Sequence, residues 1–178
     1  MRKLKLWKTS TKGRICAVCI RRCRAPLQCA VAFTIRDSTP EDFETLWRID
    51  QECFPPGIAY SQRELKLYMR RRGAFTLVAN DGEGKIAGFI VAQGGPTGHI
   101  VTIDVIPEAR RARVGSLLMK AAEDRLCAAG SQAVGLETAV DNAAALAFYK
   151  RHGYSVIRTW PRYYPNGVDA LVMQKELR

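Results

Sequence analysis

The sequence has few of the residues, and none of the long apolar segments, on which several common functions depend. Only two of its 178 residues are histidines, which makes a His-rich metal site or a Ser-His-Asp triad a poor expectation. No stretch approaches about 18 uninterrupted apolar residues, so the sequence predicts no membrane-spanning helix. With 47% hydrophobic and 25% charged residues, the composition is typical of one globular domain.

The first 36 residues contain no acidic side chain, so most of the net positive charge of the chain lies in this segment. Ten of the 28 lysines and arginines lie there, which leaves 18 basic against 17 acidic residues in the remainder. Such a segment attracts polyanions or anionic membrane surfaces, and it is also typical of an organellar transit peptide. A translation start placed too far upstream explains it equally well. We expect residues 1–30 to be a flexible basic extension with weak polyanion contact, and residues 31–178 to be the domain.

Cysteines occur in both parts of the chain, and neither group predicts a metal site. They are Cys16, Cys19, Cys23, Cys29, Cys53 and Cys127. The first four form C-x2-C-x3-C-x5-C, which superficially resembles a zinc or iron–sulfur pattern, but no spacer is long enough for the usual knuckle. The last two lie in helix-like patterns, where a buried free thiol is usual. We therefore expect no metal, and a reducing, cytoplasmic compartment.

Turn residues and hydrophobic periodicity predict alternating strands and helices over the domain. Strands are predicted over residues 31–36, 75–79, 85–92, 98–105, 134–140, 154–160 and 168–174, and helices over residues 40–53, 62–72, 114–129 and 142–151. A capping box, Ser61 to Glu64, starts the second helix, and Gly130 ends the third. The order β-α-α-β-β-β-α-β-α-β-β predicts an α/β (α+β) fold, with helices packed on a mixed sheet.

A strand end, a basic loop and a helix start follow one another in residues 103–116. Free backbone N–H groups at a helix start, with the helix dipole behind them, form a site for phosphate. Three arginines in the loop, Arg110, Arg111 and Arg113, supply counter-charge. A solvated basic turn that binds nothing explains the same residues.

Two further residues are candidates for proton transfer. Glu137 lies in an otherwise apolar strand, and its neighbours on the same face, Gly135 and Ala139, are small. Open space beside the carboxylate suits a general base, although a solvent-facing strand position explains it as well. Tyr149 carries a phenol that can give up a proton, although a core aromatic on a helix is the ordinary interpretation.

Two stretches complete a recognisable pattern. Residues 141–154 read D-N-A-A-A-L-A-F-Y-K-R-H-G-Y, and residues 162–173 contain Y-Y-P-N-G. With the basic loop and Glu137, they resemble the GNAT acetyltransferases from about residue 34 to residue 177. The ending is similar to the branch that acetylates protein N-termini, the ribosomal-protein-alanine N-acetyltransferases of RimI type. The resemblance implies a mixed, mostly antiparallel sheet flanked by helices.

The resemblance also implies an acetyl-CoA-dependent N-acetyltransferase, with acetyl-CoA as co-substrate. The residues that it places along acetyl-CoA are Ile103, Asp104, Val105, Arg110, Arg111, Ala112, Arg113, Val114, Gly115, Ser116 and Asn142. The pyrophosphate would lie on the backbone of residues 111–116, and Asn142 would bind the pantetheine arm.

The same resemblance assigns the chemistry and the second substrate. Glu137 would accept a proton from the amine through water, and Tyr149 would protonate the departing sulfur. The groove for a protein or peptide N-terminus, such as that of a ribosomal protein, would be shaped by Phe54, Tyr60, Tyr163 and Tyr164. Because the transfer is direct, no nucleophilic cysteine is needed.

One residue departs from the family pattern. The family's loop reads R/Q-x-x-G-x-G/A, and Arg113 stands where the first glycine is usual. Glycine permits a positive φ, whereas arginine must adopt an ordinary helical conformation or bear strain. The cation could compensate by reaching a phosphate.

Two other functions stay open at the level of sequence. One is acetylation of a small amine or a lysine side chain, and the other is a non-catalytic acyl-CoA-binding or ribosome-tethered module. The presence of both Glu137 and Tyr149 argues against the second.

Overall fold

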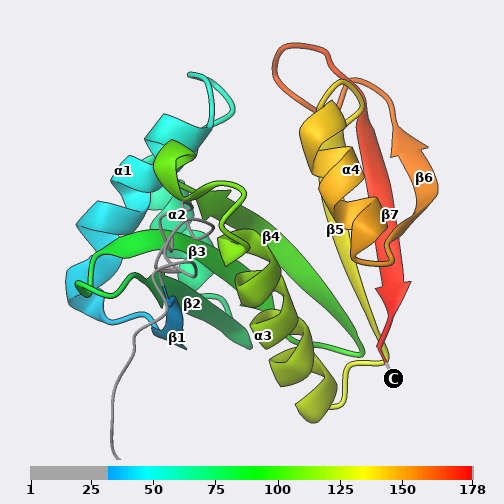
Figure 1. The fold of residues 1–178 in the computed structure, drawn as a ribbon. Helices are drawn as coiled ribbons and strands as arrows, with labels where there is room; N and C mark the ends of the chain where they lie inside the picture. The colour runs from blue at the N-terminus through cyan, green and yellow to red at the C-terminus, as the bar shows by residue number, and fades with distance from the viewer. Residues whose placement is uncertain (1–31, 178) are drawn as a thin grey trace, which may run out of the picture. The chain divides into compact units, whose positions relative to one another are not determined.

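The computed structural model describes residues 32–177, and its helices and strands follow the predicted order (Figure 1). The elements are β1 (Thr34–Asp37), η2 (Pro40–Asp42), α1 (Phe43–Cys53), α2 (Gln62–Met69), β2 (Ala74–Asn80), β3 (Ile86–Gln93), β4 (Thr97–Val105), η3 (Pro107–Ala109), α3 (Val114–Ala128), β5 (Ala133–Ala139), α4 (Ala143–Arg151), β6 (Ser155–Trp160) and β7 (Ala170–Glu176). The predicted fold class is confirmed. The basic extension and its four cysteines lie outside the described residues.

Local signals explain most boundaries. The capping box at Ser61 is present, because Ser61 Oγ accepts a bond from the Glu64 N–H and the Glu64 carboxylate accepts one from the Ser61 N–H. Gly130 has a φ of 91° just beyond α3, the left-handed conformation that commonly ends helices. The first helix differs from its prediction, because Pro40–Asp42 form a 3-10 turn before α1 begins at Phe43.

The sheet has seven strands in the order β1-β2-β3-β4-β5-β7-β6. All neighbouring strands are antiparallel except β4 and β5, which are parallel and pair only where Thr97, Gly98 and His99 lie opposite Ala133, Val134 and Gly135. Beyond these positions the two strands part, as Figure 1 shows. The parting leaves a gap inside the sheet.

Helices cover both faces of the sheet. On one face α3 and α4 pack on a cluster that includes Leu118 and Ile90, and on the other α1 and α2 pack through Leu46 and Leu65 on a cluster that includes Phe89. The strand neighbours Phe89 and Ile90 point to opposite faces, as the pleat requires. Burying a side chain of this size stabilises the fold by about 1.5–3 kcal/mol.

A β-bulge in β4 changes which face its later residues occupy. The register shifts beside Val91 and Ala92, which pair with Thr102 and Ile100, so Val101 is the extra residue. Ile100 therefore packs on the α3 side and Val101 on the α1 side. The bulge lets His99 and Asp104 face the same side of the sheet, although strict alternation would separate them.

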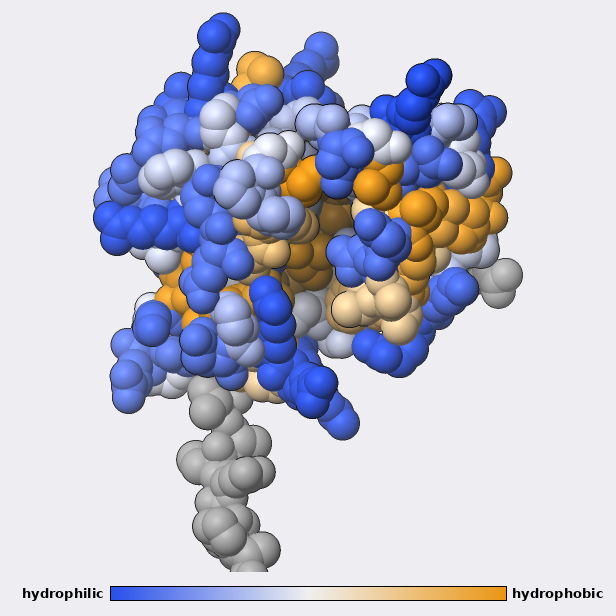
Figure 2. All heavy atoms as spheres, turned by 90° about the horizontal axis from the view of Figure 1, so that it is seen from above, coloured by the Kyte–Doolittle hydropathy of each residue, from blue (hydrophilic) through white to orange (hydrophobic). Residues whose placement is uncertain are grey.

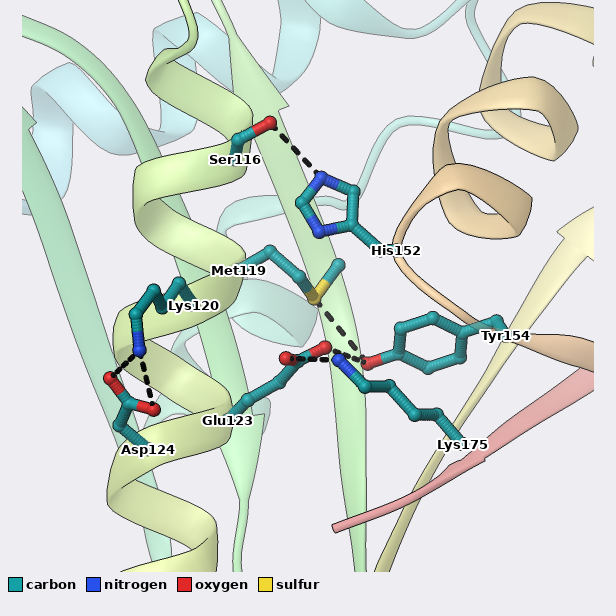
Figure 3. Close-up of polar contacts among 8 residues, drawn as sticks. All are labelled: Ser116, Met119, Lys120, Glu123, Asp124, His152, Tyr154 and Lys175. Carbon is teal, nitrogen blue, oxygen red and sulfur yellow. Dashed lines mark hydrogen bonds and ion pairs between the residues drawn. The ribbon is translucent and has the colours of Figure 1, made fainter. Parts of the chain in front are cut away.

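Polar contacts tie α3 to the strands and helix on the far side of the gap (Figure 3). The Ser116 hydroxyl lies 3.0 Å from His152 Nε2. Lower on α3, the Glu123 carboxylate accepts bonds from the Tyr154 hydroxyl at 3.1 Å and from Lys175 Nζ at 2.6 Å. Because Glu123 is buried, loss of either partner would leave a poorly compensated charge at this junction of the two sides.

Among residues 32–177, no helix combines the length and the apolar composition that a bilayer crossing needs.

Candidate active site

The gap between β4 and β5 is lined mainly by apolar side chains. Val105 on β4 and Leu146 and Phe148 on α4 are half-buried and pack against the main core. Figure 2, seen from the end at which the strands part, shows a hollow there with hydrophobic residues in its depth. Such a slot suits an extended ligand arm, which can use the backbone groups that the parted strands leave unpaired.

The basic loop ends in a concentration of free N–H groups. Leu117 N–H donates to the Arg113 carbonyl as the first bond of α3, so the N–H groups of Val114, Gly115 and Ser116 precede the helical bonding. Arg111 and Arg113 have φ values of 64° and 67°, the left-handed conformation that curls a backbone into an anion-binding concavity. These features fit a cofactor that carries a pyrophosphate.

Arg113 thus adopts the glycine-like conformation at the position where the family has glycine. Left-handed backbone costs roughly 1–2 kcal/mol for a residue with a Cβ. The ordinary helical conformation considered for Arg113 was wrong, and the strained alternative is the one observed.

The three arginines do not point to one place. Arg110 turns back, because its Nε donates to the Val105 carbonyl at 3.1 Å and its Nη2 lies 3.8 Å from Cys53 Sγ. Arg111 and Arg113 are exposed. The loop is therefore tied to the end of β4 by Arg110, whereas the side chains of Arg111 and Arg113 are open to solvent.

Of the two cysteines among residues 32–177, Cys53 is not an activated nucleophile. The Cys53 thiol donates to the Val105 carbonyl at 3.4 Å, and burial raises the pKa of Cys53 to about 11. Cys127 is exposed on α3, so the burial expected for it was wrong.

Asn142 caps α4, since its Oδ1 accepts the Ala145 N–H at 3.1 Å. Its amide NH2 remains the group that would donate to a pantetheine arm.

Glu137 and Tyr149 approach the gap from opposite faces of the sheet. Leu136 packs in the α3 cluster, so Glu137 faces the α1 side, where its side chain is 16% exposed. Tyr149 on α4 packs on the α3 side, with ring centroids 5.4 Å from Phe148 and 5.9 Å from Tyr154. Burial raises the pKa of Tyr149 above its usual value, so the phenol keeps its proton at neutral pH. The arrangement places a carboxylate and a protonated phenol on either side of one slot.

His99, which was not among the residues predicted from the sequence, lies beside Glu137. Its Nε2 lies 2.7 Å from Glu137 Oε2. The available signal was a polar residue at an alternate position in an apolar strand, but the register of β4 against β5 was needed to bring it beside Glu137.

Tyrosines from two loops stand over the Glu137 side of the gap. The ring of Tyr60 packs at a tilt against Tyr68, and the ring of Tyr163 meets Tyr164 edge-on, with centroids 5.1 Å apart in each pair. Burial raises the pKa of Tyr163, and the neighbouring charge of Glu137 raises it further. The structure therefore brings Tyr60, Tyr163 and Tyr164 around the entrance to Glu137.

The loop that carries Tyr60 begins at the half-buried Phe54 and is held in place by α1. Trp47 Nε1 and Gln51 Nε2 donate to the Tyr60 carbonyl at 3.1 and 2.8 Å, and Asp50 Oδ2 accepts the Tyr60 N–H at 2.8 Å.

Two buried acids, Asp50 and Asp104, lie beneath this loop. They are 0% and 1% exposed, and among residues 32–177 neither Asp50 Oδ1 nor Asp104 Oδ2 has a hydrogen-bond partner. Burial raises the pKa of Asp50 to about 6 and that of Asp104 well above its usual value. The resemblance placed Asp104 along the cofactor. Because its side chain is buried, only its backbone could serve that role.

The chain belongs to the acetyltransferase (GNAT) family, whose model matches residues 43–154. It is accordingly an acyltransferase that uses acetyl-CoA, as the slot and the N–H groups at the start of α3 suggest.

Individual relatives narrow the comparison. N-alpha-acetyltransferase 30 of Schizosaccharomyces pombe is 34% identical over 116 residues, which are 62% of this chain and 77% of that protein. The crystal structure of Ard1 from Thermoplasma volcanium has a TM-score of 0.76 and 30% identity, covering 83% of this chain and 99% of that one. The ribosomal-protein-S18-alanine N-acetyltransferase from Escherichia coli has a TM-score of 0.75 at 24% identity, covering 82% and 94%, and so shares the fold.

The buried acids predict a pH dependence of stability. Because the folded pKa of Asp50 is raised to about 6, its neutral form stabilises the fold below about pH 4, and that contribution is lost as the pH rises through 6. Asp50→Asn should be more stable than wild type at pH 7.5 by about 1–3 kcal/mol, and the difference should vanish near pH 4. Urea unfolding at both pH values measures this.

Asp124→Asn is the control, because Asp124 is exposed in a pair with Lys120, and it should change stability by less than about 0.5 kcal/mol. An Asp50→Asn protein with the pH dependence of wild type would contradict the assignment.

Arg113→Gly should raise the free energy of unfolding by about 1 kcal/mol, because relief of left-handed strain exceeds the added entropy of unfolded glycine. Ala112→Gly, at a position without positive φ, should lower it by about 0.5–1 kcal/mol. Acetyl-CoA affinity, measured by calorimetry, should stay within about threefold, because N–H groups rather than the guanidinium hold the phosphate. If Arg113→Gly instead binds acetyl-CoA more weakly than wild type, and the difference grows at low salt, the Arg113 cation contacts phosphate.

Proposed function

We propose that this protein transfers the acetyl group of acetyl-CoA to the α-amino group of a protein or peptide N-terminus. The observation that carries the proposal is the position of Glu137, a partly exposed carboxylate at the gap beneath tyrosines from two loops. The name of the S. pombe relative, N-alpha-acetyltransferase 30, with 34% identity, supports the same acceptor.

The bound acetyl-CoA supplies an activated acetyl thioester. The N–H groups of residues 114–116 hold its pyrophosphate at the start of α3, and the slot between β4 and β5 receives its arm. The backbone of Ile103 and Val105 and the amide of Asn142 line that path. Because the hollow is apolar in its depth, it excludes water from the reacting end.

Glu137 takes the proton that the acceptor must lose. An α-amine has a reference pKa of about 7.7–8.0, so much of it is charged at neutral pH and cannot attack a carbonyl carbon. The Glu137 carboxylate takes the ammonium proton, directly or through water, before the attack and passes it to solvent. The second amine proton leaves by the same route as the C–N bond forms.

Tyr149 supplies the opposite transfer. As the C–S bond breaks, the buried phenol donates its proton to the leaving sulfur and recovers one from solvent after release. Burial, which raises the pKa of Tyr149, keeps the phenol protonated until the transfer, and the negative charge that develops on the sulfur makes the sulfur its acceptor. Charge therefore does not accumulate on either leaving or attacking atom.

The remaining assignments follow from the same placement. All proposed site residues lie between Phe54 and Tyr164, so we propose residues 31–178 as the catalytic domain and residues 1–30 as an extension outside it. A ribosomal-protein acceptor, in keeping with the name of the E. coli structure, and a cytoplasmic location are part of this proposal.

A peptide panel tests the acceptor. Peptides that differ only in their first residue, each with one internal lysine, are incubated with acetyl-CoA and sequenced by mass spectrometry. The proposal predicts acetyl on the α-amine of at least one peptide and none on the same peptide with a blocked N-terminus. Acetyl on lysine alone, or on small amines alone, would contradict it.

Substitution at the two catalytic residues tests the proton transfers. Glu137→Gln should lower kcat about 10²–10⁴-fold at neutral pH, with partial recovery at high pH, where the amine arrives unprotonated. Tyr149→Phe should lower kcat while leaving acetyl-CoA affinity nearly unchanged, since only a hydroxyl is lost. Glu83→Gln, in the exposed turn before β3, is the matched control and should be silent. A near-wild-type kcat in either site variant, with chemistry rate-limiting, would show that its assigned role is wrong.

A further inference from the structure

The contact between His99 and Glu137 stands at the closed end of the gap. His99 is the last residue of β4 that pairs with β5, and it lies opposite Gly135. Glu137 follows two residues along β5 on the same face. Because Gly135 has no side chain, the imidazole can lie over that position and reach Glu137, with Nε2 and Oε2 2.7 Å apart.

The hydrogen bond occupies one carboxylate oxygen and leaves the other for chemistry. A glutamate side chain has three torsions, of which the last is broad, so an untethered carboxylate samples many orientations. A bond from Nε2–H to Oε2 restricts that torsion, and the second oxygen, Oε1, is then held in one orientation. Bonds to an ionised acceptor are about twice as strong as neutral ones, which suits such a tether.

Glu137 is more enclosed than His99. Glu137 is 16% exposed, whereas His99 is 42% exposed. With Nε2 bonded to the carboxylate, the second ring nitrogen, Nδ1, is left as an acceptor. The imidazole therefore meets water on one side while Glu137 itself stays largely enclosed.

We propose that His99 is a positioning residue for acetyl transfer, which donates Nε2–H to Glu137 Oε2 and thereby aims Oε1 at the incoming amine. The proposal rests on the proposed function and adds the residue that orients its base. The amine proton goes to Glu137 Oε1, the acetyl carbon passes from sulfur to nitrogen, and His99 keeps its Nε2–H throughout.

A pair of substitutions at His99 separates positioning from packing. His99→Phe keeps the ring volume and loses the donor, so it should lower kcat about tenfold to a hundredfold, a part of what a general base contributes. The KM for acetyl-CoA should stay within about twofold. His99→Gln places an amide donor near the position of Nε2 and should recover most of kcat. Equal losses in both variants, or a wild-type kcat in His99→Phe, would overturn the proposal.

A double-variant cycle tests whether His99 acts through Glu137. In the Glu137→Gln background, His99→Phe should cause no further loss of kcat, because there is no carboxylate left to aim. Losses that multiply would show that His99 acts independently, which overturns the positioning role.

Nitrogen-15 NMR of the two histidines gives a readout without turnover. In wild type without substrates, His99 should show the Nε2–H tautomer, and its ring shifts should change in Glu137→Gln. His152, whose partner is Ser116, is the internal control and should not change. An Nδ1–H tautomer at His99, or shifts that ignore Glu137→Gln, would overturn the proposal.

The proposed acceptor and the proposed role of His99 can be refuted independently. If no panel peptide is acetylated, the proposed acceptor is wrong, and the tautomer measurement still decides whether His99 tethers Glu137. If peptides are acetylated but the cycle is additive, the acceptor stands and the positioning role is wrong.

Discussion

The parting of β4 and β5 is the constraint on which the rest of this structure depends. The two strands are the only parallel neighbours in the sheet of residues 32–177, and they pair at three positions before they separate. Each residue beyond the separation gives up backbone hydrogen bonds that a continuous sheet would supply. Those unpaired groups, with the N–H groups at the start of α3, are what a long polar cofactor can satisfy.

A gap of this kind closes unless its two sides are held apart by something else. The contacts of α3 with the far side, above all the buried Glu123 with Lys175 and Tyr154, provide that spacing. The His99 contact with Glu137 spans the gap at its closed end. The unfavourable features, left-handed Arg111 and Arg113 and the buried acids Asp50 and Asp104, surround the gap. Strain of this sort persists where a rigid surrounding structure enforces it, and it is frequent at functional sites.

Signals local in sequence predicted the elements and several site residues. The Ser61 capping box, the helical spacing from Val114 and alternation around Glu137 each reported on a few neighbouring residues, and the structure agrees with each. The basic loop was placed at a helix start for the same reason. The matching family model confirms the family that these stretches resembled.

The site features that could not be predicted from the sequence depend on pairing between distant strands. His99 meets Glu137 only because β4 and β5 pair in one particular register, and Asp104 shares the face of His99 only because of the bulge at Val101. Neither the register nor the bulge has a signal within a single strand. The raised pKa of Asp50 likewise follows from burial under the Tyr60 loop, which composition alone does not reveal.

The most direct test of this account is a titration of the isotope-labelled protein with acetyl-CoA, followed through backbone amide signals. The account predicts the largest changes at Val114, Gly115 and Ser116 and along β4 beyond His99, with β1 and β2 nearly unaffected. Saturable binding whose largest changes lie away from both the start of α3 and the parted strands would contradict it.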